Sequence, residues 1–161
     1  ASAASKHADL PIGMVYEKPL DLADLNSLPQ GMDLKALYLA AETVFDATEE
    51  EAATVRAFVE GGGFLIIDGA GTQLDPVQRT LHFEEWDVEI RALPVDHPLF
   101  SEETAYTIDA PALSGIYRGE ELVGVVSSAD LASGWTGEAD ADLTPAWAQG
   151  INVVLFVAGR E

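Results

Sequence analysis

One segment, "TEEEAATVRAFVEGGGFLIID" (residues 48–68), constrains the fold more than any other part of this sequence. Thr48 stands three residues before Glu51, which is the spacing of a capping box, and the acids after Thr48 suit the positive end of a helix. Apolar residues then recur at helical spacing, and the glycines at 61–63 supply a left-handed exit. "FLIID" is a continuous apolar run, which is typical of a strand buried on both faces. The segment therefore predicts a helix followed by a buried strand.

The neighbouring segments continue this alternation. "LKALYLA" (34–40) and "VEIRALP" (88–94) predict two more strands, and "DPVQRTLHFEEW" (75–86) predicts a helix with His82 on its surface. Strands and helices that alternate at this spacing favour a parallel sheet with crossover connections.

The last third of the chain has a different pattern. "LSGIYRGEELVGVVSS" (113–128) predicts an antiparallel hairpin around "RGEE". Thr144 and Pro145 suit the start of a helix that continues to residue 158, although the β-branched residues of this segment leave a strand as the alternative.

Length and composition predict one globular domain. The chain has 161 residues, of which 48% are hydrophobic, enough for a single core over residues 10–161. Residues 1–9 are small and polar, and we expect them to form a flexible segment. No stretch approaches the roughly 20 apolar residues of a membrane span, so we expect no direct membrane insertion.

The chain is strongly acidic, with 28 Asp and Glu against 8 Lys and Arg and a net charge of −20. A field of this sign repels phosphate backbones, so nucleic-acid binding is not expected. The acids are scattered, which favours a solvated surface of the kind that also suits high salt; the alternative is a basic partner or bound cations.

Four segments, taken in order, carry a resemblance to a known family. They are "VRAFVEGGGFLIID", "LPVDHPLF", "GIYRGEELVGVVSSADLASGW" and "AWAQGINVVLFV". Together they resemble the bacterial family called domain of unknown function 4159, which is similar in fold to class I glutamine amidotransferases. The resemblance implies an α/β three-layer sandwich of flavodoxin-like type, with a mostly parallel central sheet plus a C-terminal β-hairpin and helix.

The resemblance also implies a cellular place. Family members resemble parts of bacterial envelope systems, beside membrane-anchored von Willebrand-type proteins and MoxR-type ATPases. An envelope protein partner and a location in the cell envelope or periplasm are therefore expected, with the cytoplasm left open.

The turn after residues 64–68 is the first candidate site. In the amidotransferases the equivalent strand ends at a nucleophilic cysteine, and the resemblance places that position at Asp68 or Gly69. This chain has no cysteine, which excludes glutaminase activity. Asp68 would lie at the carboxyl end of a strand, where Gly69 and Gly71 let backbone amides approach a ligand. The alternative is that Asp68 only caps the turn.

His97 and Asp130 are the other candidate ligand-binding residues. His97, in "VDHPLF", follows a strand and has the pKa of a general base, or else it only fixes its loop. Asp130, in "SSADLASGW", follows the hairpin. If their loops converge, Asp68, His97 and Asp130 would form a carboxylate–imidazole–carboxylate metal set.

These features favour a non-catalytic module on an amidotransferase-like scaffold, which binds a small molecule or a protein and serves as an accessory domain of an envelope system. The alternative is a metal-dependent hydrolase that uses Asp68, His97 and Asp130. On balance the sequence favours a protein that is not an enzyme, and it does not indicate a cofactor.

Overall fold

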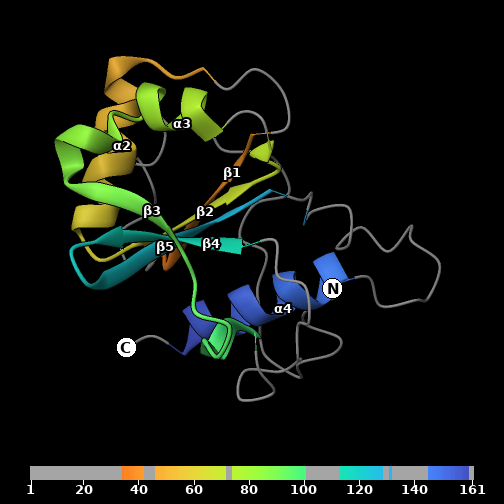
Figure 1. The fold of residues 1–161 in the computed structure, drawn as a ribbon. Coiled ribbons are helices and arrows are strands. Elements are labelled where there is room, and N and C mark those ends of the chain that lie inside the picture. The colour runs from red at the N-terminus through yellow and green to blue at the C-terminus, as the bar shows by residue number, and fades with distance from the viewer. Residues whose placement is uncertain are drawn as a thin grey trace. The chain divides into compact units, whose positions relative to one another are not determined.

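The computed structural model describes residues 34–41, 46–71, 74–100, 113–128, 131 and 145–159 (Figure 1). These residues belong to two compact units. The larger unit holds the described residues of 34–93 and 113–128, and the smaller unit holds those of 94–100, 131 and 145–159. The expected flexible segment, residues 1–9, and the candidate Asp130 lie outside the described residues, and the single domain over 10–161 stays a prediction.

The larger unit is built on a five-stranded sheet with the order β1-β2-β5-β4-β3. Its strands are β1 (Ala36–Ala40), β2 (Phe64–Asp68), β3 (Val88–Ala92), β4 (Leu113–Arg118) and β5 (Glu121–Ser127). β1 and β5 both pair with β2 in parallel, whereas β4 pairs antiparallel with both β5 and β3. All five strands agree with the predicted strand segments.

The sheet is mixed, and the expectation of a mostly parallel, flavodoxin-like sheet is wrong. The expected hairpin is present, but it forms the middle of the sheet instead of an addition to it. β4 and β5 are joined through a turn at Gly119 and Glu120, and a connection this short permits only antiparallel pairing. Because β5 takes the place beside β2, β4 must run against it, and β3 is displaced to the far edge.

Helix α2 (Glu49–Glu60) connects β1 to β2 and has the predicted capping box. The backbone N–H of Glu51 donates to Thr48 Oγ1 over 3.2 Å, and the N–H of Thr48 donates to Glu51 Oε2 over 2.6 Å. The left-handed residue of the exit is Gly62, with φ of 96°. The sequence prediction of this helix and its start is confirmed.

The helix predicted over 75–86 is interrupted. Helix α3 (Leu74–Thr80) ends before His82, which has φ of 55°, and a short 3₁₀ helix η3 (Phe83–Trp86) follows. Asp87, directly after η3, also has a positive φ, 58°. A left-handed residue cannot continue a right-handed helix, so His82 breaks the segment in two.

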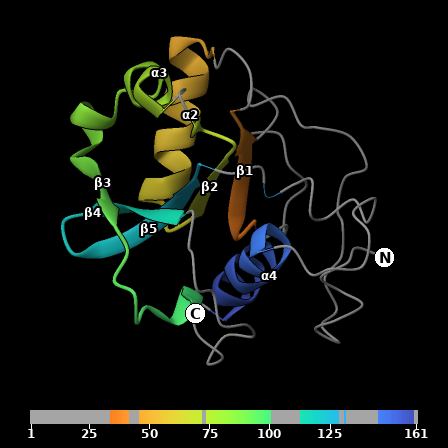
Figure 2. The same cartoon turned by 45° about the vertical axis from the view of Figure 1, so that its right-hand side comes forward.

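The main core of the larger unit lies between one face of the sheet and α2, α3 and η3, which all lie on the same side (Figures 1 and 2). The strands contribute alternate residues, as expected where only one set of side chains faces a given layer. The buried members from the sheet include Leu37, Leu39, Leu65, Ile67, Ile116 and Val126; those from the helices include Val55, Val59, Val77, Phe83 and Trp86.

The smaller unit contains η4 (Pro98–Phe100) and α4 (Pro145–Ala158). Helix α4 confirms the predicted terminal helix, and the alternative of a strand there is wrong. The two elements are joined by a hydrogen bond of 2.8 Å from Asn152 Nδ2 to the carbonyl oxygen of Leu99. Asn152 is fully buried, so its amide requires this partner. Among the described residues, no helix is long and apolar enough to cross a membrane.

Candidate functional site

The candidate turn that follows residues 64–68, called the corner below, lies at the carboxyl end of β2, between β1 and β5. The backbone N–H of Ala41 donates to the carbonyl oxygen of Asp68 over 2.7 Å, and the N–H of Ala70 donates to that of Ser127 over 2.9 Å. These bonds connect the ends of the three parallel strands. The structure thus brings Asp68, Gly69 and Ser127 together at the end of the sheet where these three strands finish.

The side chain of Asp68 is fully buried, with 0% of its surface exposed. The hydroxyl of Tyr38 on the neighbouring strand β1 donates a hydrogen bond to Asp68 Oδ2. Both residues lie on the same face, because the register pairs Tyr38 with Ile66, two positions before Asp68. A buried carboxylate needs such donors to offset its lost hydration. Asp68 therefore supports the corner from inside.

The two glycines after Asp68 have positive φ angles, a backbone conformation that glycine adopts readily. Gly69 has φ of 67° and Gly71 has φ of 36°. Gly69 is half-buried, whereas Gly71 is exposed. Among the described residues, a side-chain carbon added at Gly71 would come near the carbonyl oxygen of Ser128 alone, at 3.8 Å. The turn thus presents backbone rather than side chains outward, and the roles of Asp68, Gly69 and Gly71 in ligand binding stay predictions.

His97 lies in the smaller unit and is held by its own loop. Its Nδ1 accepts a hydrogen bond of 3.2 Å from the backbone N–H of Leu99. Its ring centroid lies 5.7 Å from that of Phe156 on α4 and 6.4 Å from that of Phe100. Burial lowers the pKa of His97, while the charge of Asp96 acts in the opposite direction. The contacts are those expected of a histidine that fixes a loop.

The proposed metal set is not brought together by the described residues. Asp68 and His97 belong to different units, and Asp130 lies outside the described residues. Within the described part of the chain, no group of three or more His, Asp or Glu side chains is arranged to hold a metal ion.

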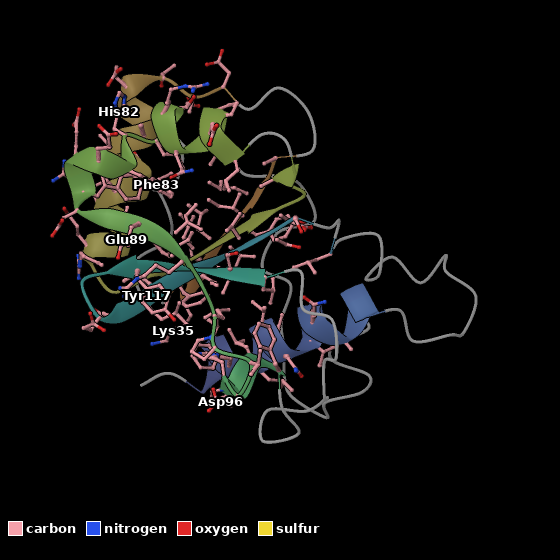
Figure 3. All side chains as sticks on the ribbon, in the orientation of Figure 1. Lys35, His82, Phe83, Glu89, Asp96 and Tyr117 are labelled. Carbon is pink, nitrogen blue, oxygen red and sulfur yellow. The ribbon has the colours of Figure 1, made fainter. Side chains whose placement is uncertain are left out.

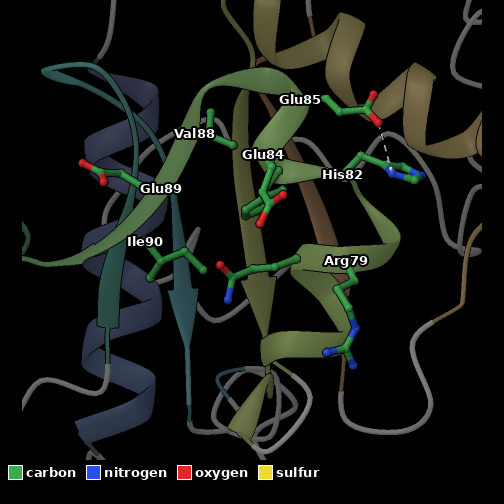
Figure 4. Close-up of a pocket in the computed structure, with 9 residues that line it drawn as sticks. Arg79, His82, Glu84, Glu85, Val88, Glu89 and Ile90 are labelled. Atoms are coloured by element: carbon green, nitrogen blue, oxygen red, sulfur yellow. Dashed lines mark ion pairs between the residues drawn. The ribbon is translucent and has the colours of Figure 1, made fainter.

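A groove that the sequence did not reveal lies between β3 and the segment formed by α3, His82 and η3 (Figure 4). Its volume is about 510 Å³. Three of its lining residues are apolar: Phe83, Val88 and Ile90. The others are polar or charged: Gln78, Arg79, His82, Glu84, Glu85 and Glu89.

His82 joins the groove to the start of α2. Its Nε2 lies 3.2 Å from the carboxylate of Glu49, and its Nδ1 lies 3.6 Å from Glu85 Oε1. Figure 3 shows His82 at the outside of the unit, with Phe83 next to it directed inward. His82 was expected on a helix surface; instead it is a half-buried, left-handed residue between two carboxylates. The only sequence signal was the spacing of His82 and Asp87, two residue types that tolerate this backbone conformation.

Comparison with protein families gives one match. The model of the family described as Domain of unknown function (DUF4159) matches residues 29–157. The match covers most of the chain, and the chain therefore belongs to this family. No curated protein matches the chain.

Proposed function

We propose that this member of the DUF4159 family is a non-catalytic binding module, built on a scaffold related to the class I glutamine amidotransferases and serving as an accessory domain in a bacterial envelope system. The observation that carries the proposal is the environment of Asp68. The residue at the end of β2, where the amidotransferases place their nucleophile, is a fully buried carboxylate bonded to Tyr38. A fully buried carboxylate in that position is bonded within the end of the sheet and is not exposed to a substrate.

Two further features support binding without catalysis. The chain has no cysteine, so no thiolate attack is available at the corner or elsewhere. The turn after Asp68 exposes Gly71, whose backbone a ligand or protein partner could approach closely. We retain Asp68, Gly69, Gly71, His97 and Asp130 as proposed ligand-binding residues. In the larger unit, Asp68 supports from inside the turn that carries Gly69 and Gly71; in the smaller unit, His97 supports its own loop.

The structural role of Asp68 is tested by a double-mutant cycle with Tyr38→Phe and Asp68→Asn. We expect Tyr38→Phe to lower the free energy of unfolding by about 1–3 kcal/mol, because a buried carboxylate loses a donor. The two changes should be non-additive, since the residues contact each other. The free energies are measured by urea unfolding. An increase in stability on Asp68→Asn would contradict the proposal, because functional residues often reduce the stability of the fold.

The binding function is tested by cross-linking the purified chain to envelope proteins of the organism that makes it, followed by reassembly with each purified candidate. We expect a partner that binds in the absence of added metal. Calorimetry with Zn²⁺, Mg²⁺ and Mn²⁺ provides the opposing test. Stoichiometric binding of a divalent ion that Asp68→Ala weakens would favour a metal-dependent hydrolase and overturn the proposal.

A further inference from the structure

The groove between β3 and the α3–η3 segment continues the core of the larger unit. Phe83 and Val88, in its floor, are only 2% and 8% exposed and belong to the main core cluster. Ile90 is partly buried and packs against the same cluster. The groove volume, about 510 Å³, falls within the range of roughly 300–1,000 Å³ that is usual for ligand clefts. An apolar side chain placed there would extend an existing core.

The rim of this groove is predominantly acidic. Glu84, Glu85 and Glu89 are exposed carboxylates, and Arg79 is the one basic residue with a guanidinium among the lining residues. Glu89 is directed to the opposite side of β3 from Ile90 (Figure 4). Glu85 contacts His82, and Glu89 forms an ion pair of 2.9 Å with Arg91 that lacks hydrogen-bond geometry. Within the described part of the chain, Glu84 has no ion pair, so its charge is available to a partner. The net charge of −20 adds a long-range attraction for basic partners.

The backbone around the groove is unusual. Among the described residues, the two non-glycine positions with a positive φ are His82 and Asp87, which stand directly before and after η3. Such conformations are costly and persist where the surrounding structure enforces them, often at binding sites. They hold Glu84 and Glu85 at the rim while Phe83 faces the core.

One wall of the groove is an edge strand. β3 is the last strand in the sheet order, and no other described strand pairs with its outer side. Figure 4 shows Ile90 directed from β3 toward the groove and Arg79 on the opposite side. The main chain of an extended segment can add to an exposed strand edge while alternate side chains enter the neighbouring cleft.

We propose that this groove binds an extended protein segment in which apolar residues alternate with lysine or arginine. An apolar side chain of the segment fills the space above Phe83, Val88 and Ile90. Its basic side chains meet the exposed carboxylates of Glu84 at the rim and of Glu89 on the opposite side of β3. The inference rests on the proposed binding function and assigns a surface and a partner chemistry to it.

The test measures fluorescence anisotropy with three short synthetic peptides at physiological salt. In the first, lysine alternates with leucine; in the second, serine replaces leucine; in the third, glutamate replaces lysine. We expect the first to bind the intact chain and the second to bind at least about tenfold more weakly, which corresponds to about 1.4 kcal/mol. The third should not bind, because the rim repels it.

A matched pair of variants locates the binding. Glu84→Gln removes one exposed charge at the rim, and Glu60→Gln removes one at the far end of α2. Glu60 lies roughly 16 Å along the helix axis from Glu49, the residue that contacts His82. We expect Glu84→Gln to weaken binding about fivefold (about 1 kcal/mol) and Glu60→Gln to leave it nearly unchanged. Circular dichroism checks that both variants keep the fold.

Several outcomes would overturn the inference. They are absence of binding by the lysine–leucine peptide, equal binding of the lysine–serine peptide, equal weakening by both variants, or equally tight competition by spermidine, a small polycation. A cross-linked envelope partner whose affinity is unchanged by Glu84→Gln would refute the groove while the proposed binding function stands. Metal-dependent catalysis would instead refute the proposed function.

Discussion

At the scale of single residues, the sequence predicted where Asp68 and His97 lie in the chain's elements, but not which groups their side chains contact. The sequence placed Asp68 at the end of a strand correctly, but its partner Tyr38 is 30 residues away in the chain. A carboxyl group buried so deeply is costly unless it is hydrogen-bonded, and this need explains the contact between the side chains of Tyr38 and Asp68. His97 is a second example, because its imidazole accepts a hydrogen bond from Leu99 in its own loop.

The half-buried environment of His97 predicts how its ring titrates. Its pKa should lie below 6.5, the value of an unperturbed histidine, because burial disfavours the charged ring. Between the lowered pKa and 6.5, the unfolded chain binds more protons than the folded chain. The contribution of His97 to stability is therefore present above pH 6.5 and is lost as the pH falls through this window.

The measurement is an NMR titration of the ring signals, assigned with His97→Gln. Asp96→Asn is the informative companion, because the charge of Asp96 raises the pKa of His97 and its removal should lower that pKa further. A pKa at or above 6.5 in the intact chain would show that the ring is not buried as described.

At the scale of elements, glycines decide how closely the strands approach. A side-chain carbon at Gly124 would lie 2.4 Å from the carbonyl oxygen of Leu65 on β2. One at Gly115 would lie 2.4 Å from the ring of Tyr117, which crosses the strand there and stacks against the guanidinium of Arg91 at 4.3 Å. The parallel pairing of β2 with β5 thus depends on the absence of a side chain at residue 124.

We predict that Gly124→Ala lowers the free energy of unfolding by about 1–3 kcal/mol, as overpacking of a core does. The obstructing atom belongs to the backbone, so it cannot rotate away. Chemical denaturation measures the loss. The matched control is Gly159→Ala, whose added carbon would meet its nearest neighbour at 3.5 Å and should cost much less. Equal effects of both substitutions would argue against the close approach of β2 and β5.

At the scale of the whole molecule, charge opposes compactness. With 28 acidic and 8 basic residues, repulsion outweighs the few surface ion pairs, such as Arg56–Glu60. Exposed pairs of this kind contribute only about 0–1 kcal/mol each. The net effect of screening should therefore be to stabilise the fold.

We predict that the thermal midpoint rises by at least about 3 °C, or about 1 kcal/mol for a chain of this size, when salt increases. Raising the concentration from about 0.1 M to about 1 M shortens the screening length from roughly 10 Å to roughly 3 Å. Calorimetry with sodium, potassium and choline chlorides provides the measurement. Equal shifts indicate screening, whereas a shift with one cation alone indicates specific binding. A falling midpoint would mean that attractive pairs dominate.

Local chemistry was sufficient to predict most of the elements. The capping box at Thr48, the apolar runs of β1 and β2, and the hairpin around Gly119 are all recognisable because each depends on residues close in sequence. The break at His82 was missed, since the repeat of apolar residues continues through it and only packing against Glu49 and Glu85 reveals it.

The sequence by itself thus determined most of the helices and all the described strands, the excess of acidic residues, and the absence of a thiol nucleophile. The tertiary structure decided the strand order, the burial of Asp68 against Tyr38, and the groove beside β3. The reason is physical: hydrogen bonds and apolar periodicity within a segment are local. Which strand lies beside β2, and which side chains meet across a groove, depend on packing between segments far apart in the chain.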